Sequence, residues 1–304
     1  MNIVRIFCGR LGMLKVPLVL LVALSLASDP VLAQEEDIQF VLLGKTRNHR
    51  QSPSGDLSFL NTAFFGEIFL NEGGTVTNAH VTGPGHAEAG LFFGDQDVPF
   101  FAGDRYPSIE SLEEDFPDGT YLFDFDTPHG NVRDMPVTFS KRGQASRNPA
   151  PIRMTLHQKG SVADPDAIDP DEDLRVTWSD FEYGAADPLG IIDDLIFVIM
   201  GNCLGVKTVH SGAAFGDSFL DYADKEFTIP KESLRPGQPF QVEIEFSEMD
   251  TGQWNGLTSI ITYAASTFLD IRTTGSNEDD IACPAQPLAM DGGQTDRKRA
   301  GGGS

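Results

Sequence analysis

Hydrophobic and polar residues alternate most regularly over residues 227–246, where the chain is FTIPKESLRPGQPFQVEIEF. Side chains two positions apart lie on the same face of a strand, so the apolar residues at 240, 242, 244 and 246 predict one buried face. Gln241, Glu243 and Glu245 predict a solvated face on the other side. The Pro-Gly pair within 234–237 predicts a turn between this strand and a shorter one before it. The segment therefore predicts a strand, a turn and a second strand.

The first half of the chain shows the same two-residue period in several short runs. Four of these runs predict strands, at 37–44, 62–70, 75–82 and 119–127. The polar run at 45–56 predicts a loop after the first strand. The four residues NEGG at 71–74 predict that the second and third strands form a hairpin. Tyr121, Phe123 and Phe125 fall on one face of the fourth strand.

One short helix is predicted among these strands, from Ser108 to Phe116. A serine stands at its start, acidic residues fill its first turns, and the sequence Pro-Asp-Gly follows its last residue. These are the start and stop signals of a helix. The rest of the first half has the Gly and Pro content of strands joined by turns.

A family resemblance appears in the second half, over about residues 149–274. The segment Leu234-Arg-Pro-Gly with an aromatic residue and a valine after it is similar to the E–F corner of fibronectin type III and immunoglobulin-like domains. Residues 174–178 (LRVTW) resemble the second strand of such a domain, with Trp178 in place of its core tryptophan. Residues 194–202 and 266–273 resemble its third and last strands. Phe240 stands where the family has a tyrosine, so the hydrogen bond of the tyrosine corner is absent.

The predicted fold class is all-β, with two tandem immunoglobulin-like or fibronectin III-like antiparallel β-sandwiches after an N-terminal signal peptide. The whole layout resembles that of secreted β-sandwich proteins of bacteria. The resemblance implies a fold and leaves the function open, because such sandwiches carry unrelated activities. The predicted divisions are a signal peptide at 1–33, a first sandwich at 35–142, a linker at 143–150, a second sandwich at 151–274 and a disordered tail at 275–304.

The N-terminal segment has the three parts of a signal peptide. Arg5, Arg10 and Lys15 precede the apolar run at 16–27, and Val31-Leu32-Ala33 resembles a cleavage site. The apolar run is short for a bilayer span, although a retained anchor is the alternative interpretation. We therefore expect a secreted or periplasmic protein with no membrane insertion after cleavage.

Charge and cysteine content narrow the expected partners. Cleavage after residue 33 leaves 19 Lys and Arg against 44 Asp and Glu, a net charge of −25, because three basic residues and Asp29 leave with the segment. This charge excludes nucleic acid as an expected partner. Cys203 and Cys283 remain, and one disulfide between them is expected in an exported chain, with two unpaired thiols as the alternative.

Acidic loops suggest a calcium site. Six carboxylates lie within 164–173, where Asp169 and Asp171 alternate as in a calcium loop, and Asp193-Asp194 forms a second acidic pair. The position that must be glycine in an EF-hand is occupied by leucine, so the expectation is a looser Ca²⁺ site between strands. The alternative is a solvated acidic loop. No other cofactor is expected.

Motifs for other chemistry are weak. Phe215 to Ser218 (FGDS) resembles the nucleophile block of GDSL-type hydrolases, but no histidine follows it, and a serine without a base is not activated. No paired zinc-ligand motif is present. Trp254 lies in the segment 250–257, where the F–G loop of a sandwich is expected, and is predicted as the ligand-contacting residue, with local packing as the alternative.

The expected function follows from these signals. We predict an exported, non-catalytic β-sandwich protein with a structural, adhesion or ligand-binding role through its loops, the first of them at 250–257. The alternative is a carbohydrate-binding or carbohydrate-active secreted protein. The expected partner is a protein or polysaccharide surface.

Overall fold

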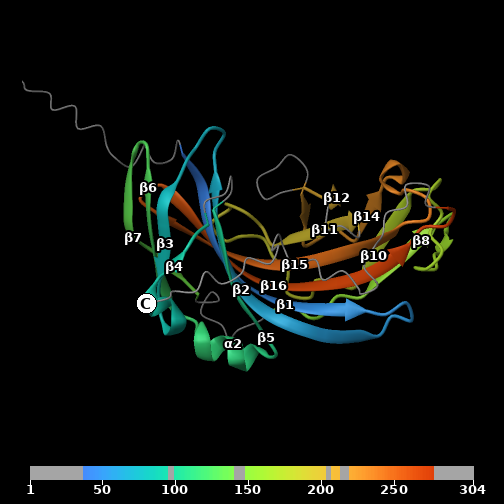
Figure 1. Cartoon of the computed structure of the whole chain (residues 1–304), viewed down its shortest axis with the longest axis horizontal. Coiled ribbons are helices and arrows are strands. Elements are labelled where there is room, and N and C mark those ends of the chain that lie inside the picture. The colour runs from blue at the N-terminus through green and yellow to red at the C-terminus, as the bar shows by residue number, and fades with distance from the viewer. Residues whose placement is uncertain (1–36, 95–98, 140–147, 203–206, 213–218, 277–304) are drawn as a thin grey trace, which may run out of the picture.

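The computed structural model describes residues 37–94, 99–139, 148–202, 207–212 and 219–276, and within them the fold is almost entirely β (Figure 1). The predicted signal peptide and Cys203, Cys283 and the FGDS motif lie outside these residues, as do most of the predicted linker and tail. The described residues form three sheets. The short helix is present as α2 (Ile109–Asp115), and the Ser108 side chain caps it by accepting a hydrogen bond from the Ser111 backbone N–H.

The largest sheet has eight strands and contains residues from both halves of the chain. Its order is β12-β11-β15-β16-β1-β2-β5, with β13 paired to β11. Neighbours are antiparallel, except that β1 and β16 run parallel over 12 paired positions. The bounds are β1 (Ile38–Gln51), β2 (Leu57–Leu70), β5 (Phe100–Tyr106), β11 (Leu195–Asn202), β12 (Lys207–His210), β13 (Leu220–Asp221), β15 (Pro239–Trp254) and β16 (Leu257–Arg272).

Two four-stranded sheets lie at opposite ends of the long one, as Figure 1 shows. One has the order β4-β3-β6-β7 and the other β14-β10-β8-β9. Their bounds are β3 (Thr77–Thr82), β4 (Leu91–Phe92), β6 (Thr120–Thr127), β7 (Gly130–Thr138), β8 (Met154–Gln158), β9 (Ser161–Val162), β10 (Leu174–Trp178) and β14 (Glu226–Ile229). Single 3₁₀ turns occur at Gly85–Ala89 and Lys231–Ser233.

The two small sheets cover the same face of the long sheet. Odd-numbered residues of β16 contribute to both cores, with Leu257 and Ile261 in the first and Leu269 and Ile271 in the second. Alternate residues of a strand share a face, so one strand carries the hydrophobic surface for both. A third, smaller core on the opposite face includes Phe40 and also Ile260.

Hairpin β15–β16 is the longest element of the fold. Its strands pair from Pro239 opposite Arg272 to Trp254 opposite Leu257. The turn consists of Asn255 and Gly256, both with positive φ, of 48° and 86°. Two central residues with positive φ form a type I′ turn, whose twist matches that of the strands it joins. The segment at 250–257, predicted as a loop, is therefore the paired end of a hairpin.

The structure corrects two further predictions from the first half. Strand β1 continues through 45–51, where the sequence predicts a loop, because polar side chains there have partners elsewhere in the protein; Lys45, for example, is buried in an ion pair. The predicted hairpin between 62–70 and 75–82 is wrong, since β2 pairs with β1 and β5 while β3 pairs with β4 and β6. The long sheet contains strands from both sides of the predicted linker, through the β1–β16 pairing, and the predicted domain boundaries stay a prediction.

Most strands of the second half occur where the sequence predicts them. Strand β10 covers the predicted 174–178, and β11 begins one residue after the predicted 194. Trp178 is in the core, and its indole N–H donates to the Asp224 carbonyl at 3.2 Å. Phe240 is buried in the same core. The predicted all-β class is confirmed.

Candidate functional site

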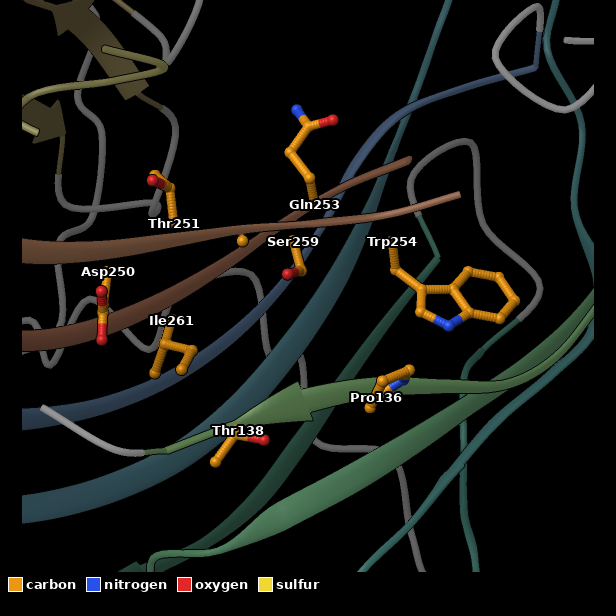
Figure 2. Close-up of a pocket in the computed structure, with 9 residues that line it drawn as sticks. Pro136, Thr138, Asp250, Thr251, Gln253, Trp254, Ser259 and Ile261 are labelled. Atoms are coloured by element: carbon orange, nitrogen blue, oxygen red, sulfur yellow. The ribbon is translucent and has the colours of Figure 1, made fainter. Parts of the chain in front are cut away.

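A groove of about 260 Å³ lies at the end of the long hairpin, between β15–β16 and β7. Figure 2 shows Asp250, Trp254, Ser259 and Ile261 pointing from the hairpin toward Pro136 and Thr138 of β7. The groove is on the face of the long sheet that carries the first small sheet, at the edge of its core. Its lining is mixed, with Pro136, Trp254 and Ile261 as the apolar residues and polar residues between them.

The alternation of β15 places the polar and aromatic groups of the groove on one line. Asp250, Gly252 and Trp254 share a face, and across the hairpin they lie opposite Ile261, Ser259 and Leu257. Gly252 keeps the middle of this line open, because a Cβ atom there would lie 2.8 Å from the Ser259 hydroxyl oxygen. The groove thus has a carboxylate at one end, an indole at the other and exposed backbone between them.

Trp254 is anchored by packing against the first core. The side chain is partly buried and contacts a cluster that includes Leu257 and Ile261. Thr251 and Gln253, which point to the opposite side in Figure 2, have hydrogen bonds of their own: Thr251 donates to Asp187 at 2.8 Å and Gln253 to Thr258 at 3.0 Å. These bonds and the backbone pairing, which continues to Trp254 opposite Leu257, hold the end of β15 in place. Packing against the first core positions the indole beside the groove.

The groups lining the groove suit a small polyhydroxylated molecule. The Asp250 carboxylate accepts hydrogen bonds, the Ser259 and Thr138 hydroxyls donate and accept them, and the indole supplies a flat apolar surface. Thr138 is fixed by a 2.9 Å hydrogen bond between its hydroxyl and that of Thr120. Concave sites with an aromatic wall and a few polar groups are typical of ligand pockets.

The predicted contact residue Trp254 lies in this groove, but as the end of a strand instead of part of a loop. Its partners in the groove, Asp250 and Ser259 among them, were not singled out by the sequence. The signal that would have found them is the Asn255-Gly256 pair, which places residues 250, 252 and 254 opposite 261, 259 and 257. Pro136 and Thr138, which β7 contributes to the groove, have no comparable signal in the sequence, because their position depends on how the sheets pack.

The predicted calcium residues fall in two separate loops. Asp169 accepts a hydrogen bond from Lys159 at 2.6 Å and another from the Asp171 backbone N–H at 3.0 Å. Asp194 is fully buried and accepts from two backbone N–H groups, those of Ala185 at 2.9 Å and Met249 at 2.7 Å. In addition, Asp193 accepts from the Asp187 backbone N–H at 2.8 Å.

Across the described ranges, no group of three or more His, Cys, Asp or Glu side chains is arranged to hold a metal ion. The hydrogen bonds of Asp169 and Asp194 give both carboxylates a role in fixing their loops. Calcium binding by Asp169, Asp171, Asp193 and Asp194 stays a prediction.

The other face of the long sheet carries two carboxyl groups whose pKa values are raised, those of Glu243 and Glu245. Burial raises the pKa of Glu243 to about 8, with the negative charge of Glu245 as the second cause. Burial also raises the pKa of Glu245, although hydrogen bonds from Ser247 and Ser266 oppose the rise. The sequence predicts a solvated face here. That prediction is wrong for Gln241, which is fully buried, whereas Glu243 and Glu245 are partly exposed.

No family model matches the chain, and no curated protein matches it. Among solved structures, it is similar to one described as the crystal structure of trypsin activated alpha-2-macroglobulin from Escherichia coli, at 13% identity and a TM-score of 0.20. The match covers 77% of this chain and 15% of that one, so the chain spans a small part of that protein. A TM-score of this size does not establish a common fold.

The part of the chain that the structure describes contains no helix with the length and apolar character needed to cross a bilayer.

Proposed function

We propose that this protein is a non-catalytic binding protein whose hairpin groove takes a carbohydrate ring. The observation that carries the proposal is the line of Asp250, Gly252 and Trp254 along one face of β15, opposite the Ser259 hydroxyl. A sugar ring has an apolar face that stacks on an aromatic plane and hydroxyl groups around its edge that exchange hydrogen bonds with carboxylates and alcohols. The groove offers both kinds of surface within about 260 Å³.

The proposed scaffold is an immunoglobulin-like sandwich in the second half of the chain. Two strand orders support it. In one sheet β8, β10 and β14 have the positions of strands A, B and E of that fold. In the other sheet β12, β11, β15 and β16 have the positions of strands C′, C, F and G. The loop between strands F and G, at one end of such a sandwich, is a common recognition site. Here the F and G strands extend far beyond the sandwich and present Trp254 against β7.

Export completes the proposal, supported by the signal-peptide pattern at 1–33 and the acidic composition. A polysaccharide on a cell surface or in the medium would be the partner. Binding without catalysis fits a groove whose described lining includes a single carboxylate, Asp250. Hydrolysis of a glycosidic bond ordinarily requires two carboxyl groups.

The test is an array of oligosaccharides derived from cellulose, xylan, chitin and starch, followed by calorimetry with the best ligand. Trp254→Ala is expected to weaken binding by about tenfold or more, as for other aromatic contacts in binding sites. Gly252→Val fills the middle of the groove while keeping the indole, and is expected to abolish binding. Tyr183→Ala removes an aromatic side chain that is 50% exposed outside the groove, and serves as the control.

Two outcomes would contradict the proposal. One is an array that stays blank with the wild-type protein. The other is binding that Gly252→Val and Trp254→Ala leave unchanged while Tyr183→Ala removes it, because the carbohydrate would then bind elsewhere. Retained folding of each variant is checked by circular dichroism.

A further inference from the structure

Lys45 lies in the middle of β1 and is fully buried, with 1% of its side chain exposed. Its amine donates to Asp118 Oδ1 at 2.7 Å and to Glu113 Oε1 at 2.8 Å. Both carboxylates come from the end of α2 and the residues after it, 68 and 73 positions along the chain. An amine and two carboxyl groups are thus held together at the edge of the first core, with the amine shielded from water.

Aromatic rings surround the amine on its core side. The Lys45 nitrogen is 4.9 Å from the centre of the Phe139 ring. Edge contacts connect that ring to Tyr121 and Tyr263, with centroids 5.7 Å and 5.4 Å away. All three aromatic side chains are buried. This apolar shell shields the Lys45 amine from water on its core side, while the Glu113 and Asp118 side chains remain 31% and 35% exposed.

The two carboxyl groups are held in different ways. Glu113 contacts the amine through Oε1 and the Asp118 backbone through Oε2, which accepts from the Asp118 N–H at 3.2 Å. Asp118 Oδ1 receives a second hydrogen bond from the Tyr263 hydroxyl at 3.2 Å. When the Lys45 nitrogen attacks the carboxyl carbon, the Tyr263 hydroxyl would stabilise the negative charge that develops on Oδ1. Glu113 is placed to carry protons, and Asp118 to accept a nucleophile.

From this geometry we propose that Lys45 and Asp118 join in an intramolecular amide bond, with Glu113 as the proton carrier. One proton of the Lys45 ammonium group passes through Glu113 to Asp118 Oδ2, which leaves a neutral amine and a neutral carboxylic acid. The amine nitrogen then attacks Asp118 Cγ and the C–N bond forms. A second proton passes from nitrogen through Glu113 to Oδ2, the C–Oδ2 bond breaks, and Oδ2 departs as water.

This reaction balances without an added reagent. The positive ammonium and the negative carboxylate become one neutral amide and one water molecule, the third proton stays on the amide nitrogen, and Glu113 returns to its starting state. Condensation of an amine with a carboxyl group is unfavourable in dilute solution. Holding the two groups at hydrogen-bond distance gives effective concentrations of about 10⁵–10⁸ M in well-oriented intramolecular reactions, which favours the amide.

The bond would connect the central strand of the long sheet to the helix. Besides the Glu113–Lys45 ion pair, α2 is attached by packing of Ile109 and Leu112 against the first core, by the Tyr106–Asp115 hydrogen bond of 2.7 Å and by the His86–Asp115 contact of 3.2 Å. A covalent tie between β1 and the segment after α2 would fix this helix against the sheet during local opening. It would also replace a buried ion pair, whose desolvation is costly, by a neutral group.

Peptide mapping of the purified wild-type protein by mass spectrometry tests the proposal directly. After complete tryptic digestion, we expect one linked species that contains both Lys45 and Asp118 and is lighter than the two peptides together by one water molecule. Trypsin is expected not to cleave after Lys45. Recovery of both peptides separately and unmodified would overturn the proposal, and this measurement requires no variant to fold.

Variants then assign the roles. Asp118→Asn is expected to form the same amide with loss of ammonia in place of water, whereas Asp118→Ala forms none. Glu113→Gln is expected to slow formation by about 100-fold, the usual size of general acid–base assistance; an unchanged rate would overturn the role of Glu113. The internal control is the ion pair of Lys159 and Asp169, at 2.6 Å on the surface. A link there in equal yield would show that proximity alone, or the preparation, creates such bonds, and would overturn the proposal.

Discussion

Glu243 offers a measurable link between protonation and stability. Its side chain is partly buried on an interior strand, and its pKa is raised from an ordinary 4.5 to about 8 by burial and by Glu245. The folded protein therefore binds a proton at Glu243 over a pH range in which the unfolded chain has released it. Folding is favoured by the protonated form, so stability is retained below pH 4.5 and is lost progressively as the pH rises toward 8.

The size of the effect follows from the shift. One pKa unit corresponds to about 1.4 kcal/mol, so a rise from 4.5 to about 8 sets an upper bound of about 5 kcal/mol at high pH. The hydrogen bond from Ser266 and the charge of Lys207 act in the opposite direction. The remaining exposure of the side chain allows water to screen the charge, so we expect about 2–3 kcal/mol. Glu243→Gln removes the ionisation and keeps the shape.

The assay is urea unfolding of wild type and Glu243→Gln at pH 5, 6, 7 and 8. The free energies of unfolding are expected to differ little at pH 5 and to diverge by about 2–3 kcal/mol at pH 8, with the variant more stable. Glu72→Gln, at an exposed turn position, is the control and is expected to follow the wild type. A variant that is less stable than wild type at pH 8, or equally stable throughout, would refute the reasoning, because Glu243 would then be solvated or favourably paired when ionised.

Two further predictions concern the loop before β11 and the turn of the hairpin. Asp194→Ala leaves the Ala185 and Met249 backbone N–H groups without their carboxylate acceptor, so we expect a loss of about 2–3 kcal/mol in chemical denaturation. The loss should be equal in EDTA and in Ca²⁺, whereas a loss seen only with Ca²⁺ would establish the calcium site that the sequence predicts. Gly256→Ala places a side chain at φ 86° and is expected to cost about 1 kcal/mol. It should weaken oligosaccharide binding, because the turn fixes Trp254; unchanged stability would argue against a type I′ turn.

The strands of the second half were predictable because their signals are local. In 174–178 and 240–246 the apolar residues alternate, and each strand has one side in the second core. The helix was predictable for the same reason, since Ser108 is its cap and the stop signal follows directly. Patterns of this kind depend on the residues of one element alone.

The errors occurred where a residue's partner lies far away in the sequence. Residues 45–51 look like a loop because they are polar, yet Gln51 exchanges hydrogen bonds with the backbone of Met154, 103 positions away. The turn at 71–74 exists, with the Gly74 N–H bonded to the Asn71 carbonyl at 2.9 Å, but it leads from one sheet to another. A turn signal fixes the local reversal and carries no information on which strands pair.

Trp254 shows the same limit within the candidate site. Its exposure at a sandwich end is a reasonable inference from its position, but the groove exists only because β15 and β16 continue to the Asn255-Gly256 turn and reach β7. The prediction of a solvated face failed at Gln241, which is fully buried. Alternation shows that the two faces of a strand differ in polarity, and it does not show how far the polar face is exposed to water.

Strand β16 connects all of these features. One end contributes Leu257 and Ile261 to the first core and lies beside the groove; its middle provides Tyr263, which donates to Asp118; its far end contributes Leu269 and Ile271 to the second core. In the parallel pairing of β1 with β16, Lys45 lies opposite Tyr263. A distortion of this strand would therefore change the packing in the groove, in the Lys45 cluster and in both cores. Because both cores depend on one continuous strand, the groove is supported by the whole fold and not by a loop of its own.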